Sequence, residues 1–269
     1  DSLGCLPKTA WPPTSRAAGI DVTMAQYPYT AGSTFLHVVI PPWYHSRGVD
    51  GLLRALREER GAIKHDLDTR MDWENFSQSV GWEKIFVSSV VSEANQPCVG
   101  KSISQIAAER GHADPADAAF DLLVEEQLAV GMISFGLDEA DITAIMRHPA
   151  VSFITDGLMS GRPHPRAYAT YPRILGRYVR EQGVLSLEEA VRKMTSLPAR
   201  KIRLRNKGVI AEGYDADLVV FDPDTVIDKN SYDDPRVHPA GIAHVLVNGV
   251  FVVEDAALTG ARPGRVIRD

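Results

Sequence analysis

The sequence predicts an α/β fold: a fragment of an α/β barrel followed by a small β-sandwich. Two observations lead to this prediction. Short apolar stretches alternate with helical segments up to about residue 205, and strands and turns replace the helices from residue 208 onward. Periodicity alone leaves a doubly wound sheet open, but the sequence contains no GxGxxG or GxxxxGK(S/T) motif to support a nucleotide fold.

The elements are expected from local patterns. Prolines at positions 7, 12 and 13 favour an irregular lead-in over residues 1–15. Apolar runs predict strands, and amphipathic runs with capping residues predict helices. The expected strands are 20–25, 84–91, 130–135 and 151–155, and the expected helices are 51–60, 102–111, one from 114, 139–147, 172–182 and 186–194. A hydroxyl-rich loop is expected over residues 26–34.

Three parts of the chain are expected. The lead-in covers residues 1–15, a partial barrel covers 16–205 with a helical insertion at about 96–127, and the β-sandwich domain covers 206–269. In the last part, Asn248-Gly249 between two apolar runs is typical of a tight hairpin turn.

Composition excludes several classes of function. The net charge of −6 over 269 residues argues against nucleic-acid binding, which requires clustered basic residues. The one dense basic run, residues 200–205, alternates with apolar residues and is expected to be a solvated face. No apolar run is long enough to span a membrane. The only cysteines, Cys5 and Cys98, lie far apart, so we expect no disulfide and a reducing cytoplasm.

The segment ending in Asp156-Gly157 is the most informative for chemistry. It follows a short apolar run, and a carboxylate at the C-terminal end of an α/β-barrel strand lies on the face where such barrels place their active sites. Asp-Gly is also a common turn pair, so the pattern alone leaves a capping role for Asp156 equally open. The nearby Arg166 lies in a loop stiffened by prolines, and its planar guanidinium suits a carboxylate.

Several motifs resemble a known family. Residues 27–34, Tyr-Pro-Tyr-Thr-Ala-Gly-Ser-Thr, are similar to the sixth-strand signature of the N-acyl-D-amino-acid deacylases (D-aminoacylases) of the amidohydrolase superfamily. The segments Thr-Asp-Gly at 155–157, His-Pro-Arg at 164–166 and Tyr-Pro-Arg at 171–173 resemble the eighth-strand region of that family. Residues 208–219 resemble the turn into the small β domain common to amidohydrolases, and the resemblance extends from about residue 16 to the C-terminus.

The resemblance implies that the chain is the C-terminal part of a TIM-like (β/α)8 metal-dependent hydrolase barrel with a helical insertion, followed by part of a small β-sandwich domain. It also implies a zinc-dependent hydrolase that converts an N-acyl-D-amino acid and water into a D-amino acid and a carboxylate. Asp156 would be a metal ligand and the general acid and base, acting on the metal-bound water and then on the departing amine. Arg166 would hold the α-carboxylate of the substrate, and His164, Tyr27 and Ser33 would contribute to substrate binding.

The other metal ligands expected of this family are missing from the sequence. No two of the eight histidines are separated by a single residue, so there is no HxH pair, and we expect the remaining ligands upstream of this chain. The chain alone is therefore not expected to hold zinc. Its expected partners are a small N-acyl amino acid and either an N-terminal half or a second copy.

Two alternatives stay open from the sequence. The chain could be an inactive remnant that keeps the core and loops, or an amidohydrolase acting on cyclic amides. Arg166 and the residue 27–34 segment favour the linear substrate over the cyclic one.

Overall fold

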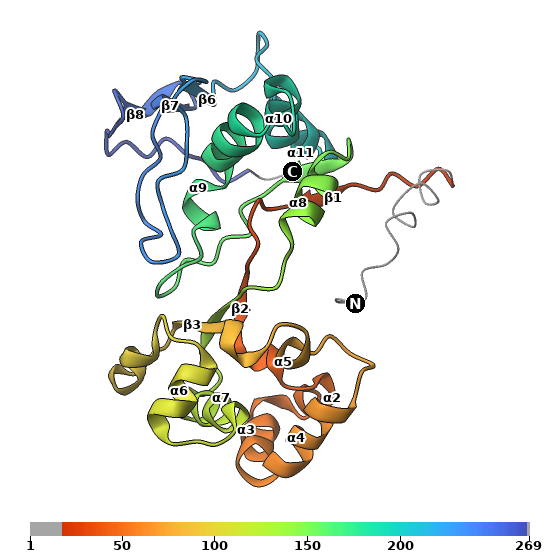
Figure 1. Ribbon diagram of the computed structural model, residues 1–269. Helices are drawn as coiled ribbons and strands as arrows, with labels where there is room; N and C mark the ends of the chain where they lie inside the picture. The colour runs from red at the N-terminus through yellow and green to blue at the C-terminus, as the bar shows by residue number, and fades with distance from the viewer. Residues whose placement is uncertain (1–17, 268–269) are drawn as a thin grey trace. The chain divides into compact units, whose positions relative to one another are not determined.

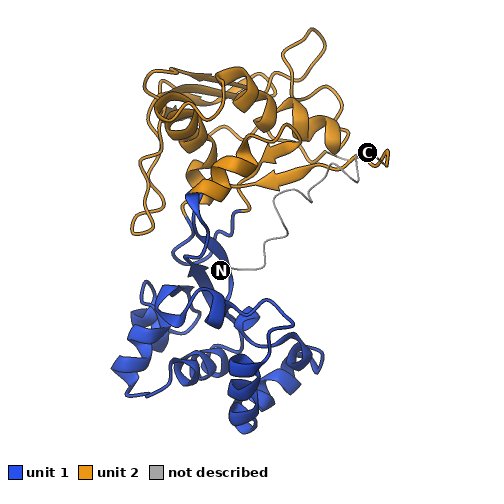
Figure 2. Ribbon diagram, turned by 45° about the vertical axis from the view of Figure 1, so that its right-hand side comes forward, with its two compact units in different colours: residues 1–9, 29–139, 157–164 blue, residues 10–28, 140–156, 165–269 orange. Residues whose placement is uncertain are grey.

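The computed structural model describes residues 18–267, so the lead-in expected over residues 1–15, including Cys5, lies outside the described residues. The chain divides into two compact units, coloured separately in Figure 2. Within the described residues, unit 1 comprises residues 29–139 and 157–164, and unit 2 comprises residues 18–28, 140–156 and 165–267.

Unit 1 is a small antiparallel sheet with a group of helices (Figure 1). Its strands are β2 (Gly32–Phe35), β3 (Ile85–Ser89) and β4 (Gly131–Ser134), arranged in the order β2-β4-β3. Its helices are η1 (Leu36–Val39), α2 (Pro42–His45), α3 (Gly48–Glu58), α4 (Arg60–Thr69), α5 (Phe76–Ser79), η2 (Trp82–Lys84), η3 (Glu93–Cys98), α6 (Ile103–Arg110) and α7 (Pro115–Glu125). One apolar core joins them and includes Leu56, Ile106 and Phe120.

Two sequence-based expectations need correction in unit 1. The loop expected over residues 26–34 ends early, because Gly32–Phe35 forms strand β2. The strands found at β3 and β4 do not take part in a parallel β/α alternation, since β4 pairs antiparallel with both β2 and β3. The helices between β3 and β4 therefore do not form a parallel crossover connection, although their pattern resembles one.

In unit 2, a parallel strand pair positions the candidate site. Strand β1 (Met24–Gln26) pairs in parallel with β5 (Val151–Phe153), which follows α8 (Glu139–Met146). The core of this unit includes Phe153, Ile174 and Tyr178. Among the described residues the strands do not close a barrel.

Four helical segments follow β5 in the chain. They are α9 (Arg166–Arg173), the π-helix η4 (Ile174–Glu181), α10 (Leu187–Met194) and α11 (Ser196–Lys201). Lys193 on α10 is fully buried and donates hydrogen bonds to the carbonyl oxygens of Met146 and His148, which lie at and just beyond the end of α8. This contact fixes α10 to the segment that leads into β5, and burial lowers the pKa of Lys193 to about 8.

The C-terminal part of unit 2 is a four-stranded antiparallel sheet in the order β6-β7-β8-β9. The strands are β6 (Leu218–Phe221), β7 (Ile242–Val247), β8 (Val250–Glu254) and β9 (Ala257–Leu258), and the expected hairpin turn at Asn248-Gly249 joins β7 to β8. Several apolar side chains of this sheet are exposed, including Val219 and Val250. The run at residues 200–205 is exposed except for half-buried Leu204, as expected for a solvated face.

Candidate functional site

The candidate site begins where the two parallel strands end. The pairing of β1 with β5 continues past the strands, because the Ile154 N–H donates to the Gln26 carbonyl oxygen at 3.0 Å. Asp156 follows two residues later with φ = 44°, in the left-handed region that a non-glycine residue rarely adopts. Because parallel strands end at the same edge, Tyr27 after β1 and Asp156 after β5 lie at one edge of the pair.

Arg166 joins these two side chains. Its Nη2 lies 2.8 Å from Asp156 Oδ2, and its guanidinium carbon lies 4.3 Å from the centre of the Tyr27 ring. Arg166 is only 1% exposed, whereas the Asp156 side chain is 57% exposed. A buried guanidinium needs a compensating charge, which Asp156 supplies while the ring of Tyr27 adds a cation–π contact.

The surroundings of Tyr27 also shift the pKa of its hydroxyl. Burial raises the pKa of the Tyr27 hydroxyl above its usual value, and the negative charge of Asp156 raises it further. The charge of Arg166 and its hydrogen bond to the hydroxyl act in the opposite direction but do not reverse the shift. Tyr27 is therefore a neutral phenol at neutral pH.

The other two residues expected to bind substrate belong to unit 1. His164 is fully buried, with Nε2 3.0 Å from the Ala31 carbonyl oxygen and its ring edge-on to Tyr29 at 5.0 Å. Ser33 lies on β2, in register with Ile133 of β4. The structure thus brings Asp156, Arg166 and Tyr27 together in unit 2, while His164 and Ser33 have surroundings of their own in unit 1.

Sequence reasoning missed three residues next to the cluster. Arg173 donates from Nε to the Pro28 carbonyl oxygen at 2.9 Å and forms an ion pair with Asp228 at 2.8 Å. Asn230 donates from Nδ2 to the Pro165 carbonyl oxygen at 3.0 Å. Arg173 lies in the Tyr-Pro-Arg segment at 171–173, which marked the region, but no sequence pattern links Asp228 or Asn230 to it.

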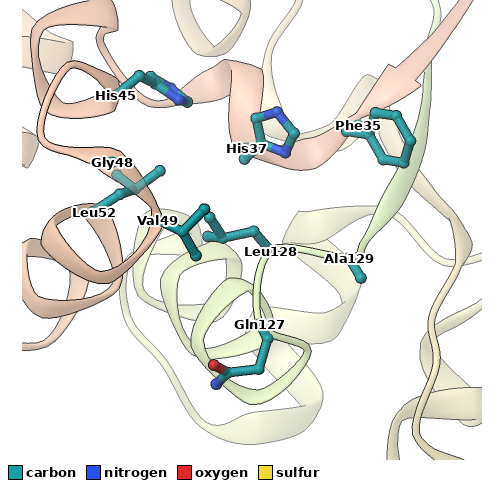
Figure 3. A pocket seen from close by; sticks show the side chains of 9 residues that line it. All are labelled: Phe35, His37, His45, Gly48, Val49, Leu52, Gln127, Leu128 and Ala129. Carbon is teal, nitrogen blue, oxygen red and sulfur yellow. The ribbon is translucent and has the colours of Figure 1, made fainter.

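A pocket of about 400 Å³ lies in unit 1 (Figure 3). The rings of Phe35 and His37 stack at 5.7 Å, and His37 lies 5.6 Å from the ring of His45. Partial burial lowers the pKa of His37, so it is neutral at neutral pH. The remaining lining is Gly48, Val49, Leu52, Gln127, Leu128 and Ala129.

A second pocket, of about 500 Å³, lies in unit 2. Arg192, Arg200 and Lys201 contribute its positive charge, and Asp21 opposes them. Lys201 donates to the carboxylate of Asp21 at 3.1 Å. Neither pocket is lined by Asp156, Arg166 or Tyr27.

The described residues do not by themselves fit a catalytic zinc ion, which takes about three protein ligands. In residues 18–267, no three His, Cys, Asp or Glu side chains lie close enough together to hold a metal. Asp156 offers one carboxylate, already paired with Arg166. Cys98 is buried in unit 1 beside Arg110, whose Nη2 lies 3.9 Å from its sulfur.

None of the helices in residues 18–267 is both long enough and apolar enough to cross a membrane.

Comparison with known proteins gives one consistent result. A family model described as the amidohydrolase family matches residues 96–253. The chain is 38% identical over 255 residues to the N-acyl-D-glutamate deacylase of Alcaligenes xylosoxydans xylosoxydans, a match covering 94% of this chain and 43% of that protein. It is 43% identical over 169 residues to the D-aminoacylase of the same organism, covering 62% of this chain and 34% of that protein.

Solved structures agree with these matches. One is the N-acyl-D-glutamate deacylase of Bordetella bronchiseptica, complexed with zinc and a phosphonate inhibitor that mimics the tetrahedral intermediate of the reaction. It has a TM-score of 0.72 and 34% identity, covering 95% of this chain and 44% of that one. A D-aminoacylase has a TM-score of 0.67 and 35% identity, covering 92% and 43%. The chain therefore spans less than half the length of these relatives.

Proposed function

Because the chain belongs to the amidohydrolase family, and within it to the D-aminoacylases, we propose that it forms part of a hydrolase that cleaves the amide bond of N-acyl-D-amino acids. The relatives named above act on N-acyl-D-glutamate or carry the name D-aminoacylase. In the whole protein, the candidate site is proposed to lie at the C-terminal ends of β1 and β5 within a (β/α)8 barrel.

The single observation that carries the residue roles is the contact of Arg166 with both Asp156 and Tyr27. Arg166 is proposed to hold the α-carboxylate of the substrate. A guanidinium has five N–H donors, so Arg166 can bind a substrate carboxylate while one nitrogen still contacts Asp156. Tyr27, a neutral phenol, packs against the guanidinium and limits its orientation.

Asp156 is proposed to move protons. Because its side chain is 57% exposed, Asp156 can accept a proton from the attacking water and return it to the departing amine. Zinc, which the Bordetella relative binds, is proposed as the cofactor of the whole protein. Because the described residues do not assemble a zinc site, these roles concern only the side chains of this chain.

The test separates acid from amide substrates. In the full gene product, Arg166→Lys is expected to raise KM for N-acyl-D-amino acids roughly 10- to 150-fold, the equivalent of a charge-assisted bidentate contact of about 1.5–3 kcal/mol. KM for the matching carboxamides should change little, since they lack the charge that Arg166 binds. Equal effects on both substrates would contradict the proposed role of Arg166, and turnover of cyclic amides alone would contradict the substrate class.

A matched control is available in the same unit. Arg200→Lys changes another arginine of unit 2, an exposed one on α11 that donates to the Ser196 carbonyl oxygen at 3.1 Å. It should leave the KM ratio between acid and amide substrates unchanged.

A further inference from the structure

The candidate site is held in place by a segment far from it in sequence, residues 222–241 between β6 and β7. This segment is a loop with one bridge, Ile227 to Ala240. Its residues Asp228 and Asn230 reach back to the elements that carry the candidate site. The ion pair between Asp228 and Arg173 is largely buried, with the two side chains 10% and 20% exposed.

Asp228 is connected, through Arg173, to the backbone next to Tyr27. Its carboxylate holds the Nη1 of Arg173 at 2.8 Å, and the Nε of the same guanidinium donates to the Pro28 carbonyl oxygen at 2.9 Å. The planar guanidinium thus ties the loop to the residue that follows Tyr27. The Tyr178 hydroxyl donates to the same carbonyl oxygen at 3.4 Å.

Asn230 is hydrogen-bonded to the backbone next to Arg166. Its Nδ2 donates to the carbonyl oxygen of Pro165 at 3.0 Å and to that of Pro235 at 3.0 Å. Pro165 is the residue immediately before α9, whose first residue is Arg166. One short loop segment therefore fixes the backbone next to both side chains of the Tyr27–Arg166 pair.

We propose that Asp228 and Asn230 are positioning residues that set the distance between Tyr27 and Arg166, so that the loop between β6 and β7 controls how the site binds a substrate carboxylate. The inference rests on the proposed function for its effect on catalysis, but not for its effect on the geometry. A cation–π contact and a bidentate ion pair both depend on the placement of the guanidinium, and a shift of about 1 Å in a binding group can reduce activity many-fold.

The first experiment measures geometry in the full chain of 269 residues. Tyrosine rings are isotope-labelled, and the Tyr27 signal is assigned by its loss in Tyr27→Phe. Asp228→Asn is expected to shift the Tyr27 ring signal in the folded protein. Asp224→Asn removes the same charge from an exposed position in the same loop and should leave that signal unchanged. An unchanged Tyr27 signal in folded Asp228→Asn would overturn the proposal, as would an equal shift in Asp224→Asn.

The second experiment measures function in the full gene product. Asp228→Asn is expected to raise KM for N-acyl-D-amino acids about tenfold with kcat changed less than threefold, and to do so much less for the carboxamides. In an Arg166→Lys background the same substitution should add no further effect, because the group it positions is gone. If Asp228 had a purely structural role, Asp228→Asn would lower the thermal stability of the protein and lower kcat with both substrates. The same losses would also appear in the Arg166→Lys background. That result would overturn the inference. Absence of any deacylase activity in the unsubstituted protein would instead overturn the proposed function and leave the decision to the Tyr27 signal.

Discussion

At the scale of single residues, Glu126 is a buried charge of unit 1 that is held by several hydrogen bonds. It is 3% exposed and accepts hydrogen bonds from the backbone N–H groups of Val91 and Ser92, at 2.6 and 3.0 Å, and from the side chains of Ser92 and Asn95. Burial alone would raise its pKa, but these donors outweigh burial and lower the pKa to about 2. The carboxylate therefore anchors the segment that follows β3 to the end of α7.

Glu126→Gln is expected to destabilise the fold by roughly 1–3 kcal/mol near neutral pH, because an amide cannot accept from all four donors. The folded pKa lies below the unfolded value of about 4.5, so the stabilising contribution is full above that value and is lost as the pH falls from about 4.5 toward 2. Denaturant unfolding of both proteins across this range measures it, and their difference should shrink as the pH falls.

The neighbouring Glu125→Gln is the matched control for Glu126. Its side chain is 45% exposed and pairs with Arg110 at 3.1 Å, so its loss should cost less than about 1 kcal/mol. An equal loss of stability in the two variants would show that the buried network has no special role.

At the scale of elements, helix α6 illustrates how local sequence determines a boundary. Ser102 accepts a hydrogen bond from the Gln105 N–H at 3.2 Å, and the Gln105 side chain accepts from the Ser102 N–H at 2.9 Å, which completes a capping box. Gly111 ends the helix in the left-handed conformation, with φ = 75°. Both boundaries agree with the pattern read from the sequence.

Ser102→Ala is expected to lower the free energy of unfolding by about 1 kcal/mol, because the backbone N–H of Gln105 at the start of α6 loses its acceptor. Ser104→Ala, two residues further along and inside the same helix, should be neutral or slightly stabilising since alanine favours helix. Chemical denaturation compares the two, and similar losses would show that the cap contributes nothing.

The sequence does not predict strand pairings or side-chain contacts between residues that lie far apart in the chain. The strands β3 and β4 were expected, but their antiparallel pairing was not, because the helices between them mimic a parallel crossover. Strand β2 lies at a sheet edge and carries serine and threonine, so it lacks the apolar alternation that marks a strand. Motifs in the sequence single out Asp156 and Arg166 as candidates, whereas Asp228 contacts Arg173 across 55 residues without any local signal.

At the scale of the whole molecule, the chain of 269 residues purified by itself is expected neither to bind zinc stoichiometrically nor to hydrolyse N-acetyl-D-amino acids. The described residues bring no three metal-ligating side chains together, and Asp156 alone cannot hold a catalytic zinc. Elemental analysis after dialysis and an assay with added zinc measure both. One bound zinc per chain with clear turnover would show that a zinc site forms after all.

The parallel pairing of β1 with β5 has a consequence for the order of folding. Ser152 donates to the Met24 carbonyl oxygen across 128 residues. Bringing the two strands together therefore closes a long loop, which costs conformational entropy. Folding of unit 1 shortens this loop. The Leu137 N–H donates to the Thr30 carbonyl oxygen at 3.0 Å, which joins the two ends of the segment 30–137. Once unit 1 has folded, the chain leaves it at two adjacent residues, from Thr30 toward β1 and from Leu137 toward α8 and β5. Unit 1 is then expected to fold early, and destabilising it should slow the appearance of native structure around Arg166.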